Sequence, residues 1–460
     1  MEADVNFGLL TLVPPILIIV FALVTRRTFE ALVLGALLAF LMSAKGNFVG
    51  ATVDAFLSVI ADNAWMWMTL GLFGSFVALL TKSKGTLGFG QLVVKYANGS
   101  KKSMIMTWIL GIIVFMDDYL NILTVSSAMK DVLDKYKQPR EMLAYIIDST
   151  GAPVCVLIPI STWAIFFSGV FQDQKELAAI DSGTFLYIQG IPFMFYAWAA
   201  VIIVPLVILG VIPKLFAMKK AYKRVSETGR VYSERSSKFN MEDGAIVGLD
   251  VQREAKGKIM NFLLPMVLII AITLYTEDLL LGLVYALALQ LVLYMATKTV
   301  SFGEFCELLA KGFANMIPML FICVGALTVK IAMDSIALPA YIINGVLPYM
   351  TPELFPAITF VVVAGLSFVT GSNWGIPAVT VPIIAPLAVL SGAHVPMTLA
   401  AIISGGTFGS HICFYSDATV LSSQASGIDN LEHAVSQIPY GAIGATIAII
   451  LYIAFGIALT

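Results

Sequence analysis

The chain has 460 residues, of which 59% are hydrophobic and 12% are charged, and its mean hydropathy is +0.91. Soluble domains carry about 25% charged residues, so this composition excludes a soluble globular protein and indicates a chain dissolved in lipid. The net charge of −2, without any basic stripe, gives no indication of a nucleic-acid partner.

Apolar runs of bilayer length follow one another along the chain. A helix needs roughly 20 residues to cross a 30 Å hydrocarbon core. Uninterrupted spans are predicted at 8–25, 28–44, 64–81, 184–212, 259–275, 278–297, 312–333, 354–370 and 433–459. The segments 103–129, 141–172 and 374–426 are also apolar, but polar residues interrupt them. We therefore expect an all-α polytopic membrane protein with about 11–13 transmembrane segments.

One long polar stretch divides the chain. Between Lys214 and Lys258 it contains 11 Lys/Arg against 6 Asp/Glu, so the positive-inside rule places it in the cytoplasm. This predicts a first membrane repeat at 1–212, a cytoplasmic linker at 213–258 and a second membrane repeat at 259–460, in the inner or plasma membrane of the cell. Residues 130–141 read as a solvated cytoplasmic turn, which suggests that 103–129 turns back as a re-entrant hairpin.

The two halves carry weakly similar polar breaks. The stretch Asp117–Val125 corresponds to Ser372–Val381, and Asp148–Cys155 corresponds to Gly406–Cys413. Interrupted apolar segments at matching places in two halves indicate a transporter site, because irregular backbone at membrane depth must line a cavity or be buried in protein. We expect two inverted repeats with two re-entrant helical hairpins and discontinuous helices. The alternative is ordinary kinks and small-residue packing.

Carboxylates occur inside the apolar segments. Each acidic residue at a helix centre costs roughly 2.5–3.5 kcal/mol on insertion scales, and no Lys or Arg is near Asp117 or Asp417 in sequence. A cation or a proton is therefore the expected partner. Sodium prefers oxygen ligands, and unwound helices supply them. The candidate Na⁺ ligands are Asp117, Asp118, Asn121, Ser372, Asn373 and Asp417.

A wider set of polar residues crowds around the same breaks. The further candidates for ion or substrate binding are Thr124, Asp148, Ser149, Thr150, Thr162, Trp374, Thr407, Ser410, His411 and Thr419. Any one hydroxyl alone is more typical of helix packing. His411 is read either as a proton relay or as a structural histidine, whereas His394 and His433 lie near segment ends.

At these motifs the sequence resembles the NhaC-type sodium/proton antiporter family of the ion transporter superfamily. The stretches that carry the resemblance are Met116–Thr124, Asp134–Glu141, Ala144–Trp163, Thr370–Gly375 and Phe408–Thr419. They span both halves, so the resemblance covers most of the chain. It implies an inverted-repeat fold with two re-entrant hairpins and a midplane site coupled to Na⁺ or H⁺.

The resemblance has one departure, because Ser410 stands where the family usually has the aspartate of Gly-Asp-His. The loss of this carboxylate favours Na⁺-coupled transport of a small organic solute, such as an amino acid, over the alternative of Na⁺/H⁺ antiport. A channel is disfavoured, since the polar clusters are paired across the two halves and form no continuous pore-lining stripe. A membrane-embedded enzyme is disfavoured, since no HExxH or cofactor motif occurs. The expected partners are the bilayer and a small solute or ion, with Na⁺ or H⁺ as coupling ion and no cofactor. A homodimer is left open.

Overall fold

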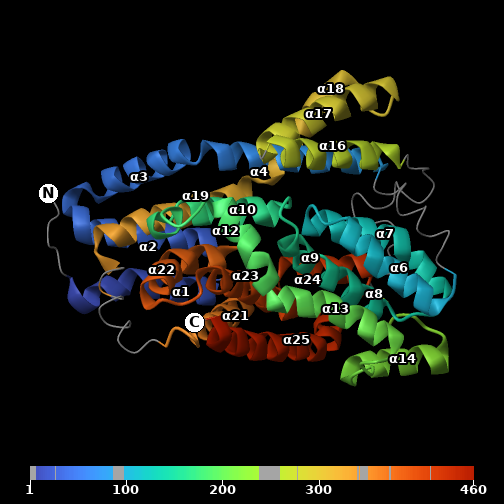
Figure 1. Ribbon diagram of the computed structural model, residues 1–460. Helices are drawn as coiled ribbons and strands as arrows, with labels where there is room; N and C mark the ends of the chain where they lie inside the picture. The colour runs from blue at the N-terminus through green and yellow to red at the C-terminus, as the bar shows by residue number, and fades with distance from the viewer. Residues whose placement is uncertain are drawn as a thin grey trace.

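The computed structural model describes residues 7–25, 27–85, 98–237, 259–276, 278–338, 341, 351–371, 374–414 and 416–459. Within these ranges every regular element is a helix (Figure 1). This confirms the all-α class. Many of the helices expose leucine, isoleucine and valine on their outer faces, as a lipid environment requires.

Besides the short 3-10 helices η1 (Gly8–Leu12), η2 (Lys45–Asn47) and η3 (Ile191–Phe193), the first half contains twelve α-helices among its described residues. They are α1 (Val13–Thr25), α2 (Thr28–Ala44), α3 (Phe48–Asp62), α4 (Ala64–Lys82), α6 (Ser100–Ile113), α7 (Asp118–Lys135), α8 (Arg140–Thr150), α9 (Ala152–Leu157), α10 (Thr162–Gln172), α11 (Lys175–Ala178), α12 (Gly183–Gly190) and α13 (Phe195–Leu209). α14 (Phe216–Thr228) follows in the predicted linker, which is described as far as residue 237. Residues 238–258 lie outside the described ranges.

The second half contributes α16 (Met260–Thr276), α17 (Leu279–Ala296), α18 (Phe302–Asn315), α19 (Ile317–Ser335), α21 (Phe355–Thr370), α22 (Gly375–Ser391), α23 (Val395–Ile412), α24 (Asp417–Ser426) and α25 (Asn430–Leu459). Three pairs of helices begin 255 residues apart, namely α6 and α21, α8 and α23, and α10 and α24. This regular spacing supports a repeat, while the inverted orientation of the two halves stays a prediction.

The interrupted segments of the first half are broken where the sequence predicts, whereas in the second half α22 continues through 375–381 and α23 continues through 406–412. α6 ends at Ile113 and α7 begins at Asp118, and α8, α9 and α10 are separated at Gly151 and at 158–161. Of the described helices, Phe29–Asp62, Leu279–Ala296 and Asn430–Leu459 are long and apolar enough to cross a membrane. Two bent pairs also qualify, Arg140–Leu157 with Thr162–Gln172 at 42° and Gly183–Phe193 with Phe195–Leu209 at 46°.

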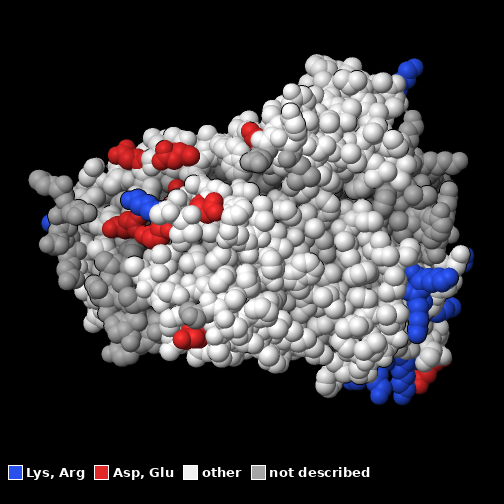
Figure 2. Space-filling model, in the orientation of Figure 1, with Lys and Arg blue, Asp and Glu red and all other residues white. Residues whose placement is uncertain are grey.

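The charges separate toward the two ends of the molecule. On the face in Figure 2, Lys and Arg gather mainly at the end where Figure 1 shows α6, α7 and α14, most Asp and Glu lie toward the other end, and the broad band between is almost uncharged. This band is the surface expected to contact lipid tails.

Candidate functional site

The first acidic site lies at the turn between α6 and α7. Asp117 is 4% exposed and is the N-cap of α7, because its Oδ1 accepts a hydrogen bond from the Leu120 amide at 2.9 Å. Asp118, the first residue of α7, is completely buried. The turn is tied to α10, since the Thr162 amide donates to the Met116 carbonyl at 3.1 Å.

Asn121 joins this turn to the end of α8. Its Nδ2 donates to the carbonyl oxygens of Gly111 at 2.5 Å, Val114 at 2.9 Å and Thr150 at 3.0 Å. Two of these carbonyls belong to the end of α6, where no following helical turn can satisfy them. Asn121 is therefore a structural clamp in this conformation, with its buried Oδ1 left without a hydrogen-bond partner among the described residues.

The second acidic site, called here the Asp148 cluster, consists of Asp148, Thr419, His433 and Gln437. One carboxylate oxygen, Asp148 Oδ2, lies 3.0 Å from His433 Nε2. It also accepts hydrogen bonds from Gln437 Nε2 at 2.7 Å and Thr419 Oγ1 at 3.3 Å. The donors come from α24 and α25, more than 250 residues away along the chain. The whole cluster is buried.

His411 lies beside the Asp148 cluster at the end of α23. Its Nε2 is 3.1 Å from Ser149 Oγ and its Nδ1 is 2.7 Å from Tyr196 Oη. Gln437 Nε2 also donates to the His411 carbonyl. The imidazole thus connects α8 to α13, and the tautomer it adopts decides which of these groups donates.

Two helix breaks, one between α23 and α24 and one between α9 and α10, are each stabilised by a capping serine with the same pattern of hydrogen bonds. Ser416 Oγ donates to the Ser410 carbonyl at 2.7 Å and accepts from the Thr419 amide at 3.3 Å. In the first half, Ser161 Oγ donates to the Cys155 carbonyl at 2.6 Å and accepts from the Ala164 amide at 3.1 Å. Each serine satisfies a carbonyl six residues earlier and an amide three residues later, so the chain can stop and restart a helix in a buried place.

The Asp148 cluster buries a carboxylate without a lysine or arginine partner. Within the described part of the chain, His433 is the one basic side chain in ion-pair contact with Asp148. His433 Nδ1 is itself buried with no hydrogen-bond partner in that part of the chain. His433 Nε2 donates to Asp148 in either charge state of the imidazole. No lysine or arginine among the described residues pairs with Asp148, so a cation or a proton is the partner that we expect for its negative charge.

Two further oxygens in the vicinity lack partners. Gln437 Oε1 and Ser410 Oγ are buried and have no hydrogen-bond partner among the described residues. Gln437 contacts Asp148 directly, and the Ser410 carbonyl accepts from Thr419, which also contacts Asp148. Neutral oxygens beside a carboxylate are the donor set that a hard cation prefers.

The other predicted site residues fall into four groups. Thr150 and Thr407 donate to carbonyls of their own helices, Ile146 at 2.8 Å and Ile403 at 2.8 Å, which is the packing role. Thr124 and Thr162 are buried on α7 and α10 near the first acidic site. Trp374 stacks on Trp163 with ring centroids 4.1 Å apart. Ser372 and Asn373 lie outside the described residues, as does the side chain of Asp417.

The structure thus brings together Asp148, Ser149, Ser410, His411 and Thr419, which the sequence placed in two separate breaks. It adds Tyr196, His433 and Gln437, which sequence reasoning missed. The sequence signal for His433 and Gln437 is that both are polar residues in the first turns of the otherwise apolar predicted span 433–459. Among the described residues, no three His, Cys, Asp or Glu side chains are grouped as a metal site, so Na⁺ ligation stays a prediction.

One correction concerns residues 130–141, read as a solvated turn. Arg140 and Glu141 are buried, because each has a charged partner. Arg140 pairs with Asp134 at 2.9 Å, and Glu141 pairs with Arg224 of α14 at 2.8 Å. The linker helix packs on this turn, and sequence proximity did not reveal it.

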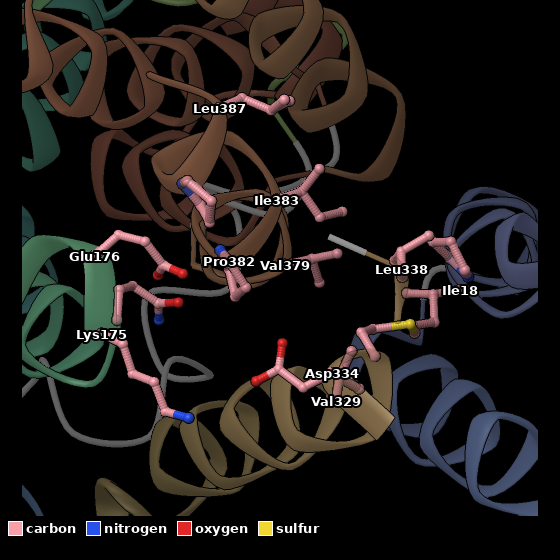
Figure 3. A pocket seen from close by; sticks show the side chains of 14 residues that line it. Ile18, Lys175, Glu176, Val329, Asp334, Leu338, Val379, Pro382, Ile383 and Leu387 are labelled. Carbon is pink, nitrogen blue, oxygen red and sulfur yellow. The ribbon is translucent and has the colours of Figure 1, made fainter. Parts of the chain in front are cut away.

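A cavity lies apart from both acidic sites, between α1, α11, α19 and α22 (Figure 3). Apolar residues of α22, among them Val379, Pro382 and Ile383, form one wall, and Lys175, Glu176 and Asp334 face it across the space. None of its lining residues belongs to the Asp148 cluster. The cavity is therefore separate from the Asp148 carboxylate.

Comparisons with known proteins agree with this picture. The model of the Na⁺/H⁺ antiporter family matches residues 154–457. An uncharacterized protein of Haemophilus influenzae is 26% identical over 98% of this chain and 92% of its own length. The malate-2H⁺/Na⁺-lactate antiporter of Bacillus subtilis is 36% identical, but over only 19% of each chain.

Two solved transporter structures share the fold. MtrF of Neisseria gonorrhoeae, described as one of a class of antimetabolite efflux pumps, matches with a TM-score of 0.57 over 90% of this chain and 85% of its own, at 15% identity. The YdaH transporter of Alcanivorax borkumensis, described as having an unusual topology, matches with a TM-score of 0.56 over 89% and 87%, at 11% identity. At these identities the likeness concerns the fold alone.

Proposed function

We propose, since the chain belongs to the Na⁺/H⁺ antiporter family, that it is a secondary transporter in which Na⁺ and H⁺ compete for the carboxylate of Asp148. One observation carries this proposal. Asp148 is buried, its three hydrogen-bonding partners are side chains from other helices, and no Lys or Arg of the described chain balances its charge. The negative charge of a buried carboxylate of this kind must be balanced by a bound cation or by a proton in every stable state of the transporter.

Competition at one carboxylate gives coupling directly. A bound cation requires the ionised carboxylate, so protonation and cation binding exclude each other. Gln437 Oε1 and Ser410 Oγ are the neutral oxygens that we assign to the cation, and the turn at Asp117, Asp118 and Asn121 is a second candidate for Na⁺. The basic surplus of the linker supports our assignment of residues 213–258 to the cytoplasmic side.

A second candidate is Na⁺-coupled transport of a small organic solute such as an amino acid. Two observations favour it. Ser410 replaces an acidic residue that simple exchangers of this family usually have at that position, and part of the chain matches an antiporter named for malate and lactate. Cation binding at Asp148 is compatible with Na⁺/H⁺ antiport and with Na⁺–solute symport, because the two proposals differ in what is transported with Na⁺.

Na⁺ binding to the purified protein tests both versions. It is measured from about pH 5.5 to about pH 8.5, the range of ordinary transport assays, with and without a panel of amino and carboxylic acids. Antiport predicts that Na⁺ affinity falls as the pH is lowered, and that Asp148→Asn removes this dependence. Solute symport predicts that a solute raises Na⁺ affinity, since linkage is reciprocal. A Na⁺ affinity that responds to neither pH nor any solute would reject both.

A further inference from the structure

The described end of the linker forms a short arm, residues 229–237, which turns back from α14 onto the membrane helices. Gly229 has φ +70°, the left-handed conformation that ends α14 and reverses the chain. The Val231 carbonyl then accepts hydrogen bonds from the Arg140 amide at 2.9 Å and from Arg224 Nη2 at 3.0 Å. The arm is thereby bonded to the first residue of α8.

Arg224 completes the attachment to α8. Its Nη1 and Nη2 donate to the two oxygens of Glu141 at 2.8 and 2.9 Å. The Glu141 side chain is 5% exposed, so the charge of Glu141 depends on this fork-like pairing, which is among the stronger side-chain interactions. Loss of Arg224 would leave a buried carboxylate without its partner.

The other end of the arm is bonded to α25. Ser233 Oγ donates to Glu432 Oε1 at 2.6 Å and Ser236 Oγ to Glu432 Oε2 at 2.5 Å. Ser236 Oγ also accepts from the Asp429 amide at 3.0 Å. Arg235 lies 3.4 Å from the Asp429 carboxylate. Glu432 is therefore held by hydroxyl groups of the arm at both of its oxygens.

These two attachments are made to α8 and α25, two of the three helices that build the Asp148 cluster. Glu432 immediately precedes His433, and Glu141 lies about two helical turns before Asp148 on α8. We infer that residues 229–237 act as a clasp, which holds α8 and α25 together and keeps Asp148 enclosed, and that the clasp must release α25 for ions to exchange at Asp148. This inference rests on the proposed function in one respect only, the need for exchange at Asp148.

Hydrogen exchange tests the clasp without any assumption about transport. In Arg224→Ala, the amides of residues 138–145 and 429–437 are expected to exchange at least about tenfold faster, since a tenfold change corresponds to about 1.4 kcal/mol of local opening. The paired variant Ser233→Ala with Ser236→Ala should accelerate 429–437 and spare 138–145. Lys223→Ala is the matched control, because Lys223 is exposed on the same helix. Unchanged exchange in both test variants would overturn the clasp.

A reducible cross-link tests whether the clasp must open. Cysteines replace Ser233 and Glu432 in a Cys306→Ser background, since Cys306 is the exposed free cysteine among the described residues. They are bridged by a short bis-methanethiosulfonate, which spans the space that the longer Glu432 side chain fills in the wild type. Na⁺-driven proton flux in proteoliposomes should fall at least about tenfold when bridged and return on reduction, relative to the unbridged double variant.

The outcomes separate the two proposals. Full flux in the bridged protein, or failure of the two cysteines to be bridged, contradicts the clasp even if exchange at Asp148 is correct. Absence of any Na⁺-linked or solute-linked flux in the wild type contradicts the proposed function, and hydrogen exchange then still decides whether the arm holds α8 and α25.

Discussion

The two buried acidic sites are held in opposite ways. The Asp117 carboxylate caps its own helix by accepting a hydrogen bond from the Leu120 amide, three residues further along the chain. Asp148 is bonded by side chains of Thr419, His433 and Gln437, which belong to α24 and α25. A local cap persists wherever its helix moves, whereas bonds between helices last only while the helices stay in place. We therefore expect the bonds of the Asp148 cluster to depend more on the positions of the helices than the cap at Asp117 does, and the comparison predicts unequal responses to mutation.

Asp148→Asn should give the largest effect. The substitution keeps the size of the side chain and removes the charge for which Na⁺ and H⁺ compete. Coupled flux should fall on the order of a hundredfold, which corresponds to about 2.7 kcal/mol. Flux in proteoliposomes is the measurement, with equal amounts of inserted protein as the control. Flux within twofold of wild type would remove Asp148 from the mechanism and reverse the comparison.

A double-mutant cycle measures how strongly Asp148 depends on α25. For His433→Ala combined with Asp148→Asn, we expect a coupling free energy of about 1.5–3 kcal/mol, the range for hydrogen bonds to charged groups. The measurement is the free energy of unfolding in detergent. The same cycle between His433 and Asp117, which share no contact in the structure, should give a value near zero. Equal coupling in both cycles would erase the distinction between the sites.

Asp117 allows its cap and its charge to be separated. Asn caps a helix as well as Asp does, so Asp117→Asn should leave stability almost unchanged while Asp117→Ala costs about 1 kcal/mol. If Asp117 contributes to Na⁺ binding, Asp117→Asn lowers coupled flux about tenfold, or 1.4 kcal/mol. Wild-type flux in both Asp117→Asn and Asp118→Asn would assign a purely structural role to this turn.

Tyr196→Phe should have the smallest effect. It removes one hydrogen bond to His411 Nδ1, worth about 1 kcal/mol between uncharged groups, so flux should fall about fivefold. Tyr452→Phe is the matched control, since its hydroxyl donates to the Phe193 carbonyl at 2.9 Å, away from His411. A larger loss in Tyr452→Phe would mean that the effect comes from packing.

The sequence predicted some membrane helices closely because hydropathy sets their positions, but two spans predicted as uninterrupted are divided. The span 184–212 is broken at Met194, before α13, and the span 312–333 is broken at Met316, between α18 and α19. Predicted spans such as 28–44 and 278–297 differ from α2 and α17 by at most one residue at either end. The breaks of the first half were also predictable, since Gly, Pro and polar residues interrupt apolar runs. The linker contact with α8 was not predictable, because Arg224 and Glu141 are 83 residues apart and each looks like an ordinary surface charge.

The site was only half predictable for the same reason. Asp148, Ser149, Ser410, His411 and Thr419 stood out as polar residues in apolar breaks. His433 and Gln437 occupy the first two turns of α25, where polar residues normally indicate the lipid headgroup region. That they face Asp148, 285 and 289 residues earlier, depends on how α25 packs against α8. Hydropathy contains no information on that packing.

The stacked pair of Trp163 and Trp374 offers an optical signal of the relation between the two halves. Trp163 is the second residue of α10 in the first half, Trp374 precedes α22 in the second, and their ring planes meet at 34°. Two indoles this close share their electronic transitions, so they give a paired near-ultraviolet circular dichroism signal that vanishes when either ring moves away. Movement of the second half relative to the first can therefore be followed by circular dichroism in the unlabelled protein. The Trp163→Phe variant, which lacks the paired signal, is the reference spectrum.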